Sequence, residues 1–127
     1  MSKGKERIPW IGVDLDGTLA EYHGWGDGKI GKPVPEMMKR VKEWLAQGNK
    51  VKIFTARAGF DDSQVPEIHK WLEKHGLPKL EVTATKDYDM VELWDDRCVQ
   101  VVPNTGVPIK EYITARYIKT FMPGSKS

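Results

Sequence analysis

The sequence has one cysteine, Cys98, so no disulfide can form within the chain. No apolar run approaches the roughly 20 residues needed to cross a bilayer, and residues 1–7 are polar, unlike a signal peptide. Charge of one sign is also lacking, since 20 Lys and Arg face 18 Asp and Glu for a net charge of +2. We therefore expect a cytoplasmic protein without a membrane segment, and the charge balance neither requires nor excludes a nucleic-acid partner.

What the chain does have is enough length and apolar content for one hydrophobic core. It has 127 residues, of which 39% are hydrophobic and 30% charged, the usual balance of a globular protein. No internal repeat and no low-complexity linker interrupts it. We expect residues 1–127 to form a single domain.

Apolar runs and helical stripes alternate along the chain. Short apolar runs predict strands over residues 8–13, 51–54, 80–84, 91–94 and 99–102. Apolar residues spaced three and four apart predict helices over 35–47, 63–75 and 108–121, the first two closed by Gly48 and Gly76. This order is typical of an α/β fold with a mostly parallel, five-stranded sheet and helices on both faces.

Chemically active side chains follow three of the predicted strands. Asp14 and Asp16 follow the first strand, Thr55 the second, and Asp95 with Asp96 the fourth. Ligands of such sheets bind beyond the carboxyl ends of the strands. An Asp-Gly turn would explain the first acid pair alone, but the second pair and Thr55 favour a shared site. Four acids near one point repel unless a cation lies among them, and oxygen ligands suit Mg²⁺.

These motifs resemble the signatures of the haloacid dehalogenase superfamily. Residues 14–19, Asp-Leu-Asp-Gly-Thr-Leu, are similar to its first signature, Asp-x-Asp-x-Thr after a buried strand. Thr55 resembles the second signature, Lys86 stands in the place of the third, a lysine, and Asp95-Asp96 resembles the fourth. The likeness extends over about residues 8–106. It implies a Rossmann-like three-layer α/β/α sandwich with strand order 5-4-1-2-3.

The resemblance also implies roles for these residues. Asp14 would attack phosphorus and become an aspartyl phosphate, while Asp16 would act first as general acid and then as general base. Mg²⁺ would be held by Asp14, the backbone carbonyl of Asp16 and Asp95, with Asp96 binding through water. Thr55 would bind a phosphate oxygen. Members that cleave carbon–halogen bonds lack the second Asp, so its presence favours phosphate chemistry.

Lys86 is the catalytic lysine that the resemblance implies, but the chain length opens an alternative. Only residues 86–90 connect it to the fourth predicted strand, whereas parallel strands normally need a crossover of about a dozen residues. Five extended residues reach about 16–18 Å. A short third strand or a stretched link would keep Lys86 from the phosphate, leaving that role to Lys32 or Lys110.

Residues 20–33, rich in glycine, predict a loop or small hairpin, which we call the flap. No separate cap domain fits in the chain, so the resemblance implies a capless member. Its open site would admit large substrates or rely on a partner subunit for closure. Gly17, His23, Ala56 and Arg57 are further expected substrate contacts. Packing of the flap explains His23 equally well, and an exposed ion pair explains Arg57 equally well.

Together these features predict a Mg²⁺-dependent phosphomonoesterase. Its substrate would be a small phosphorylated metabolite such as a nucleotide or a sugar phosphate, hydrolysed through an aspartyl-phosphate intermediate. One alternative is a phosphatase for nucleic-acid ends, although no basic stripe with interleaved aromatic residues is present. Another is a non-catalytic phosphate- or metal-binding module, which would not need Asp16 as a general acid.

Overall fold

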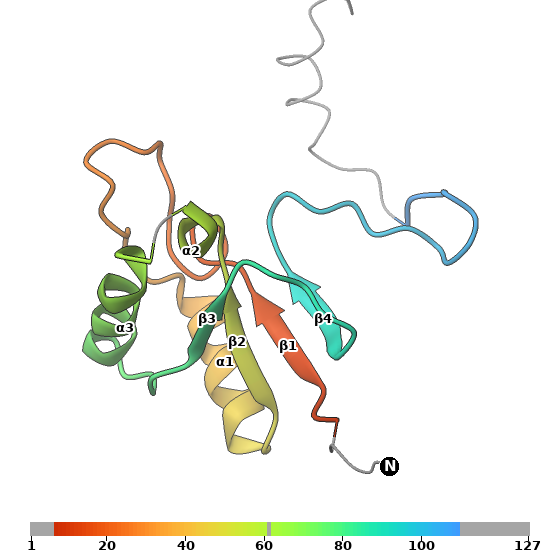
Figure 1. Ribbon diagram of the computed structural model, residues 1–127, viewed down its shortest axis with the longest axis horizontal. Helices are drawn as coiled ribbons and strands as arrows, with labels where there is room; N and C mark the ends of the chain where they lie inside the picture. Colours follow the sequence, from red (N-terminus) through yellow and green to blue (C-terminus); the bar gives the residue numbers. More distant parts are fainter. Residues whose placement is uncertain (1–6, 61, 110–127) are drawn as a thin grey trace, which may run out of the picture. The chain divides into compact units, whose positions relative to one another are not determined.

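The computed structural model describes residues 7–60 and 62–109 (Figure 1), which fall into two units with a boundary after Asp96. The first unit contains a parallel sheet in the order β3-β2-β1-β4. The elements, in chain order, are β1 (Trp10–Val13), α1 (Pro35–Ala46), β2 (Lys50–Phe54), α2 (Ala56–Phe60), α3 (Gln64–Lys74), β3 (Glu81–Thr83) and β4 (Met90–Trp94). The predicted α/β class and parallel sheet are confirmed, and these four strands begin and end within two residues of their predicted bounds.

The two longer helices begin and end where the sequence predicts. α1 has a proline at its first position, where the missing backbone N–H costs no hydrogen bond. It is followed by Gly48, whose φ of +89° suits the left-handed turn after a helix. Gly76, with φ of +84°, follows α3 in the same way. The five-residue helix α2 was not predicted, because one and a half turns leave no apolar periodicity to detect.

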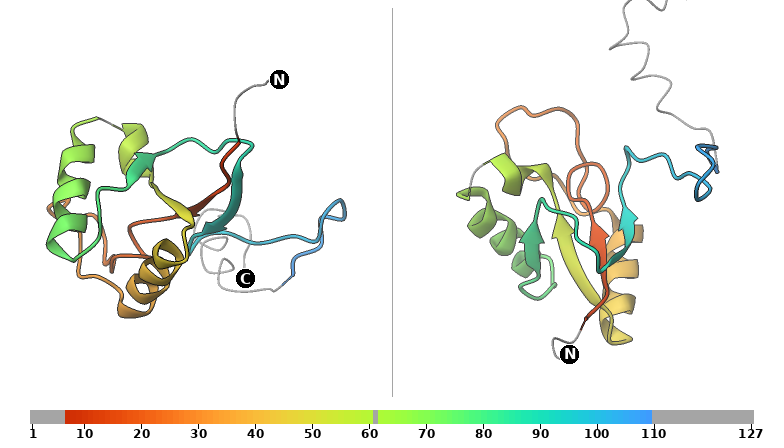
Figure 2. Two further views of the ribbon diagram at one scale, coloured as in Figure 1. Left: turned by 90° about the horizontal axis from the view of Figure 1, so that it is seen from below. Right: turned by 45° about the vertical axis from the view of Figure 1, so that its right-hand side comes forward.

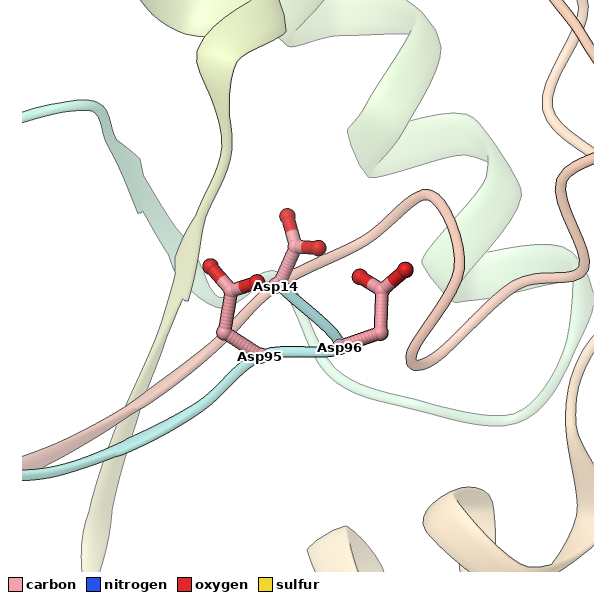
Figure 3. A group of neighbouring side chains, drawn as sticks. All are labelled: Asp14, Asp95 and Asp96. Carbon is pink, nitrogen blue, oxygen red and sulfur yellow. The ribbon is translucent and has the colours of Figure 1, made fainter. Parts of the chain in front are cut away.

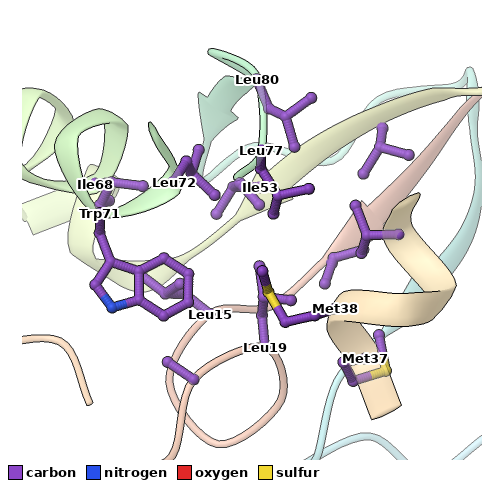
Figure 4. Packing of buried hydrophobic residues seen from close by; sticks show 14 of the residues in the cluster. Leu15, Leu19, Met37, Met38, Ile53, Ile68, Trp71, Leu72, Leu77 and Leu80 are labelled. Atoms are coloured by element: carbon purple, nitrogen blue, oxygen red, sulfur yellow. The ribbon is translucent and has the colours of Figure 1, made fainter. Parts of the chain in front are cut away.

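One face of the sheet carries the hydrophobic core. Ile11, Val13, Val51 and Ile53 alternate along β1 and β2 and are at most 8% exposed. Side chains of α1 and α3 cover this face (Figure 4), and Figure 2 shows both helices on one side of the sheet. Each fully buried aliphatic side chain contributes about 1.5–3 kcal/mol. The helix residues in this core are Met37, Met38, Val41, Ile68, Trp71 and Leu72.

The opposite face is crossed by the link between β3 and β4. Residues 84–89 form this link without a helix, in keeping with the short crossover seen in the sequence. The Trp10 indole N–H donates to Asp87 Oδ1 at 2.9 Å, and this hydrogen bond is the main cause that lowers the pKa of Asp87. Lys52 lies 4.3 Å from the centre of the Trp10 ring and 3.3 Å from Glu81. Within the described residues no helix covers this face, although the sequence predicts helices on both.

The second unit, described from residue 97 to 109, contains a tight turn. Val101 forms one antiparallel bridge with Pro108, and the Val102 N–H donates to the Val107 carbonyl at 2.8 Å. The fifth strand predicted over residues 99–102 is therefore replaced by this local pairing. The predicted helix does not begin at residue 108, and the rest of it, from 110, lies outside the described residues.

Among the helices of the described residues, none combines the length and the apolar character that a membrane crossing requires.

Candidate active site

Three strand ends meet at the carboxyl edge of the sheet. Val13 is paired with Ile53 of β2 on one side and with Trp94 of β4 on the other. The Asp14 N–H donates to the Trp94 carbonyl at 2.9 Å, so Asp14 lies beside the start of the β4 exit loop. Neighbouring strands lie about 4.8 Å apart. The register thus brings the residues after β1, β2 and β4 to one place, as their positions in the sequence indicated.

Three carboxylates converge at this edge. Asp14, Asp95 and Asp96, here called the acidic cluster, each place one oxygen within 4.8 Å of the other two (Figure 3). Asp14 and Asp95 are partly buried and Asp96 is exposed. Because all donors are carboxylate oxygens, this arrangement suits a hard cation such as Mg²⁺, which binds a few carboxylates and keeps several waters.

The surroundings of Asp14 disfavour its charged form. Burial is the largest cause, followed by the charge of Asp95 and then by a hydrogen bond with Asp96 and its charge, and together they raise the pKa of Asp14 to about 8. In the absence of a cation, the carboxyl group therefore retains its proton at neutral pH. A carboxylate nucleophile must be ionised, so a nucleophilic Asp14 needs positive charge beside it.

The loop after β1 shapes the acidic cluster. The Thr18 hydroxyl accepts the Asp96 N–H at 3.1 Å and lies 3.3 Å from Asp96 Oδ1 and 3.5 Å from Asp14 Oδ2. Gly17 has φ of +92°, and a Cβ there would lie 2.5 Å from Asp96 Oδ2. The buried side chains of Leu15 and Leu19 anchor the loop in the core. The sequence motif contained Thr18, but only the structure reveals this contact.

The Asp16 side chain lies outside the acidic cluster and pairs with Arg57. The Arg57 guanidinium donates from Nε to Asp16 Oδ2 at 2.7 Å and from Nη2 to Asp16 Oδ1 at 2.9 Å. The pair is partly buried, because the Arg57 side chain is 4% exposed and the Asp16 side chain 19% exposed. The sequence favoured a substrate contact or an exposed ion pair for Arg57 equally, and it gave no sign of this partner, which is 41 positions away. The metal ligand expected from Asp16 was its backbone carbonyl, whereas the pair uses the two side-chain oxygens.

The other expected substrate contacts differ in their surroundings. Thr55 is 3% exposed, and its hydroxyl oxygen accepts the Arg57 N–H at 3.1 Å, capping α2. Ala56 begins α2 and is exposed. The His23 side chain is 84% exposed and lies 3.3 Å from Glu21. The structure therefore brings Thr55 to the edge with Asp14, whereas the His23 ring pairs within the flap.

The lysines expected to face the phosphate are exposed or lie outside the described residues. Lys86 is exposed in the link between β3 and β4. The next residue, Asp87, is bound to Trp10 at the opposite end of β1 from Asp14. Lys32 is an exposed flap residue, and Lys110 is not among the described residues. The identity of the phosphate-facing lysine stays a prediction.

Comparison with protein-family models, with curated proteins and with solved structures found no match. The functional interpretation of this edge consequently depends on the residues of this chain and on their geometry.

Proposed function

We propose that the chain is a Mg²⁺-dependent phosphomonoesterase of the haloacid dehalogenase type, built on a Rossmann-like sandwich. Its substrate is a small phosphorylated metabolite, such as a nucleotide or sugar phosphate. The observation that supports this most is the acidic cluster: Asp14, directly after the inner strand β1, has a pKa of about 8 among two further carboxylates. Such a carboxyl group has little use in packing and suits a metal-assisted nucleophile.

The chain offers an all-oxygen donor set for the metal. Asp14, Asp95 and Asp96 would hold Mg²⁺ with their carboxylates, and Asp16 would add its backbone carbonyl. When bound, the ion offsets negative charge on the carboxylates and on the phosphoryl oxygens. Thr18 and Gly17 support this arrangement, because the Thr18 hydroxyl accepts the Asp96 N–H and Gly17 has no Cβ to collide with the Asp96 carboxylate.

The proposed reaction has two steps. The Asp14 carboxylate attacks phosphorus and the bond to the leaving oxygen breaks. Asp16 must enter this step with a proton on one oxygen, in addition to its bonds from Arg57, and it gives that proton to the leaving oxygen. Asp16 then takes a proton from water, the resulting hydroxide attacks the aspartyl phosphate, and inorganic phosphate leaves with Asp14 restored. Thr55 donates its hydroxyl hydrogen to a phosphoryl oxygen. Each Asp16 oxygen has two lone pairs, so each retains one for proton transfer while Arg57 occupies the other.

The test measures phosphate release from p-nitrophenyl phosphate, a metabolite panel and oligonucleotides with terminal phosphates, each with Mg²⁺ and with EDTA. We expect activity with Mg²⁺ alone and its reduction to background in Asp14→Asn. That variant should still fold, since it removes a buried carboxyl group with a raised pKa. Asp27→Asn, which alters an exposed flap carboxylate, is the matched control.

Two results would count against this function. Absence of Mg²⁺-dependent release across the whole panel would reject the enzyme and leave a binding module. Activity that survives in Asp14→Asn would reject the nucleophile. Release from oligonucleotide ends alone would move the substrate class to nucleic acid and keep the chemistry.

A further inference from the structure

One buried guanidinium joins four segments of the first unit. Besides its two bonds to Asp16, Arg57 donates from Nη1 to the Gly28 carbonyl at 2.7 Å and to Gln64 Oε1 at 3.2 Å. The Trp25 ring lies against the same group, with its centre 4.8 Å from Arg57 Cζ. The contacts thus link α2, the turn after β1, the flap and the first residue of α3.

These contacts use most of the hydrogen-bonding capacity of Arg57. Arginine has five N–H groups, and four are directed at Asp16, Gly28 and Gln64. The Arg57 side chain is 4% exposed. A substrate phosphate would have to displace protein partners to bind this guanidinium, so a direct substrate contact is the weaker explanation for it.

The flap is held differently at its base and at its tip. At the base, the Glu21 N–H donates to the Lys32 carbonyl at 2.8 Å and the Trp71 indole N–H donates to the Gly31 carbonyl at 2.9 Å. The tip is a turn closed by the Gly28 N–H, which donates to the Trp25 carbonyl at 2.7 Å. Both Gly28 and Trp25 contact Arg57. The base is therefore fixed by the backbone and core, whereas the tip is tied to Arg57.

We propose that Arg57 is a positioning residue that orients the Asp16 carboxylate and ties the flap tip to it. The role given to Asp16 rests on the proposed function, whereas the tie to the flap does not. The planar guanidinium can hold both Asp16 oxygens, the Gly28 carbonyl and Gln64 at once. A lysine ammonium has the same charge but three donors at one point, so it cannot bridge all of these partners.

The experiment compares Arg57→Lys with wild type in kcat, in KM and in hydrogen exchange of the flap. We expect kcat to fall about 10–100-fold with KM changed less than about twofold, as for groups that orient a site residue. Exchange of the Gly28 amide should become about tenfold faster, while that of the Glu21 amide at the base is unchanged. Arg40→Lys is the matched control, because Arg40 also lies over a tryptophan ring but is an exposed residue of α1.

A second variant covers the case in which a buried lysine prevents folding. Gln64→Ala keeps the guanidinium and removes one of its acceptors. We expect kcat to fall about fivefold and exchange of the Gly28 amide to become about fivefold faster. A rise in KM with kcat retained would overturn the proposal in favour of a substrate contact. Wild-type kcat or unchanged Gly28 exchange in both variants would also overturn it. If wild type releases no phosphate, the proposed function fails, and the exchange measurement alone still decides whether Arg57 ties the flap.

Discussion

Mg²⁺ binding to the acidic cluster should depend steeply on pH between 6 and 8. The cause is Asp14, whose pKa is raised to about 8 by burial and by its acidic neighbours. A metal ligand must be ionised, so each bound ion has to displace the Asp14 proton. As pH rises towards 8, less proton displacement is needed and the affinity for Mg²⁺ increases.

The size of the effect follows from that pKa. With a value of about 8, Asp14 is about 1% ionised at pH 6, about 9% at pH 7 and half ionised at pH 8. The dissociation constant for Mg²⁺ should therefore fall about 50-fold from pH 6 to pH 8 and level off above pH 8. Close to one proton should be released per ion at pH 6, and about half a proton at pH 8.

Isothermal titration calorimetry in two buffers with different ionisation heats measures both quantities. Glu43→Gln, which changes an exposed carboxylate on α1, should reproduce the wild-type pH dependence. Asp95→Asn removes the charge that contributes most after burial, so it should weaken Mg²⁺ binding and flatten its dependence on pH. Equal dissociation constants at pH 6 and pH 8, or binding without proton release, would show that Asp14 does not lose a proton when Mg²⁺ binds.

Three further predictions concern stability, each measured by urea unfolding. Without metal, the raised pKa of Asp14 makes a contribution to the free energy of unfolding that is complete below about pH 4 and is lost as pH rises through about 8. The free energy should fall by at most about 1.4 kcal/mol per pH unit in this range, and Mg²⁺ should reduce the fall. A free energy that does not change with pH would contradict this prediction. Gly17→Ala should lower the free energy of unfolding by about 1–3 kcal/mol more than Gly24→Ala. Both glycines have positive φ, but only a Cβ at Gly17 meets a carboxylate, that of Asp96 at 2.5 Å. Equal losses in the two variants would argue against that contact. Trp10→Phe should lower the free energy of unfolding more than Trp25→Phe, because the Trp10 side chain is 2% exposed and packed whereas Trp25 is 50% exposed; equal losses would argue against packing of Trp10 as the cause.

The sequence was sufficient to predict the helices and strands that have a clear period. The apolar stripe of α1 and the alternating apolar residues of β1 and β2 show in the sequence because those side chains form the core. The ends of the two long helices are marked by glycines that have positive φ. It failed for α2, which is too short to show a period, and for the valines of residues 99–102. Valine is common in strands, but Val101 and Val102 pair locally across a turn, which β propensity alone does not distinguish.

The order of the residues is enough to predict that acids follow the first and fourth strands, and a parallel sheet brings such residues to one edge. Which of the acids meet there depends on how the chain packs. Strand register brings Asp14, Asp95 and Asp96 together, while the Asp16 side chain turns to Arg57. Composition and spacing could not reveal that division, because pairing across 41 positions depends on how the flap, α2 and the turn after β1 pack against one another.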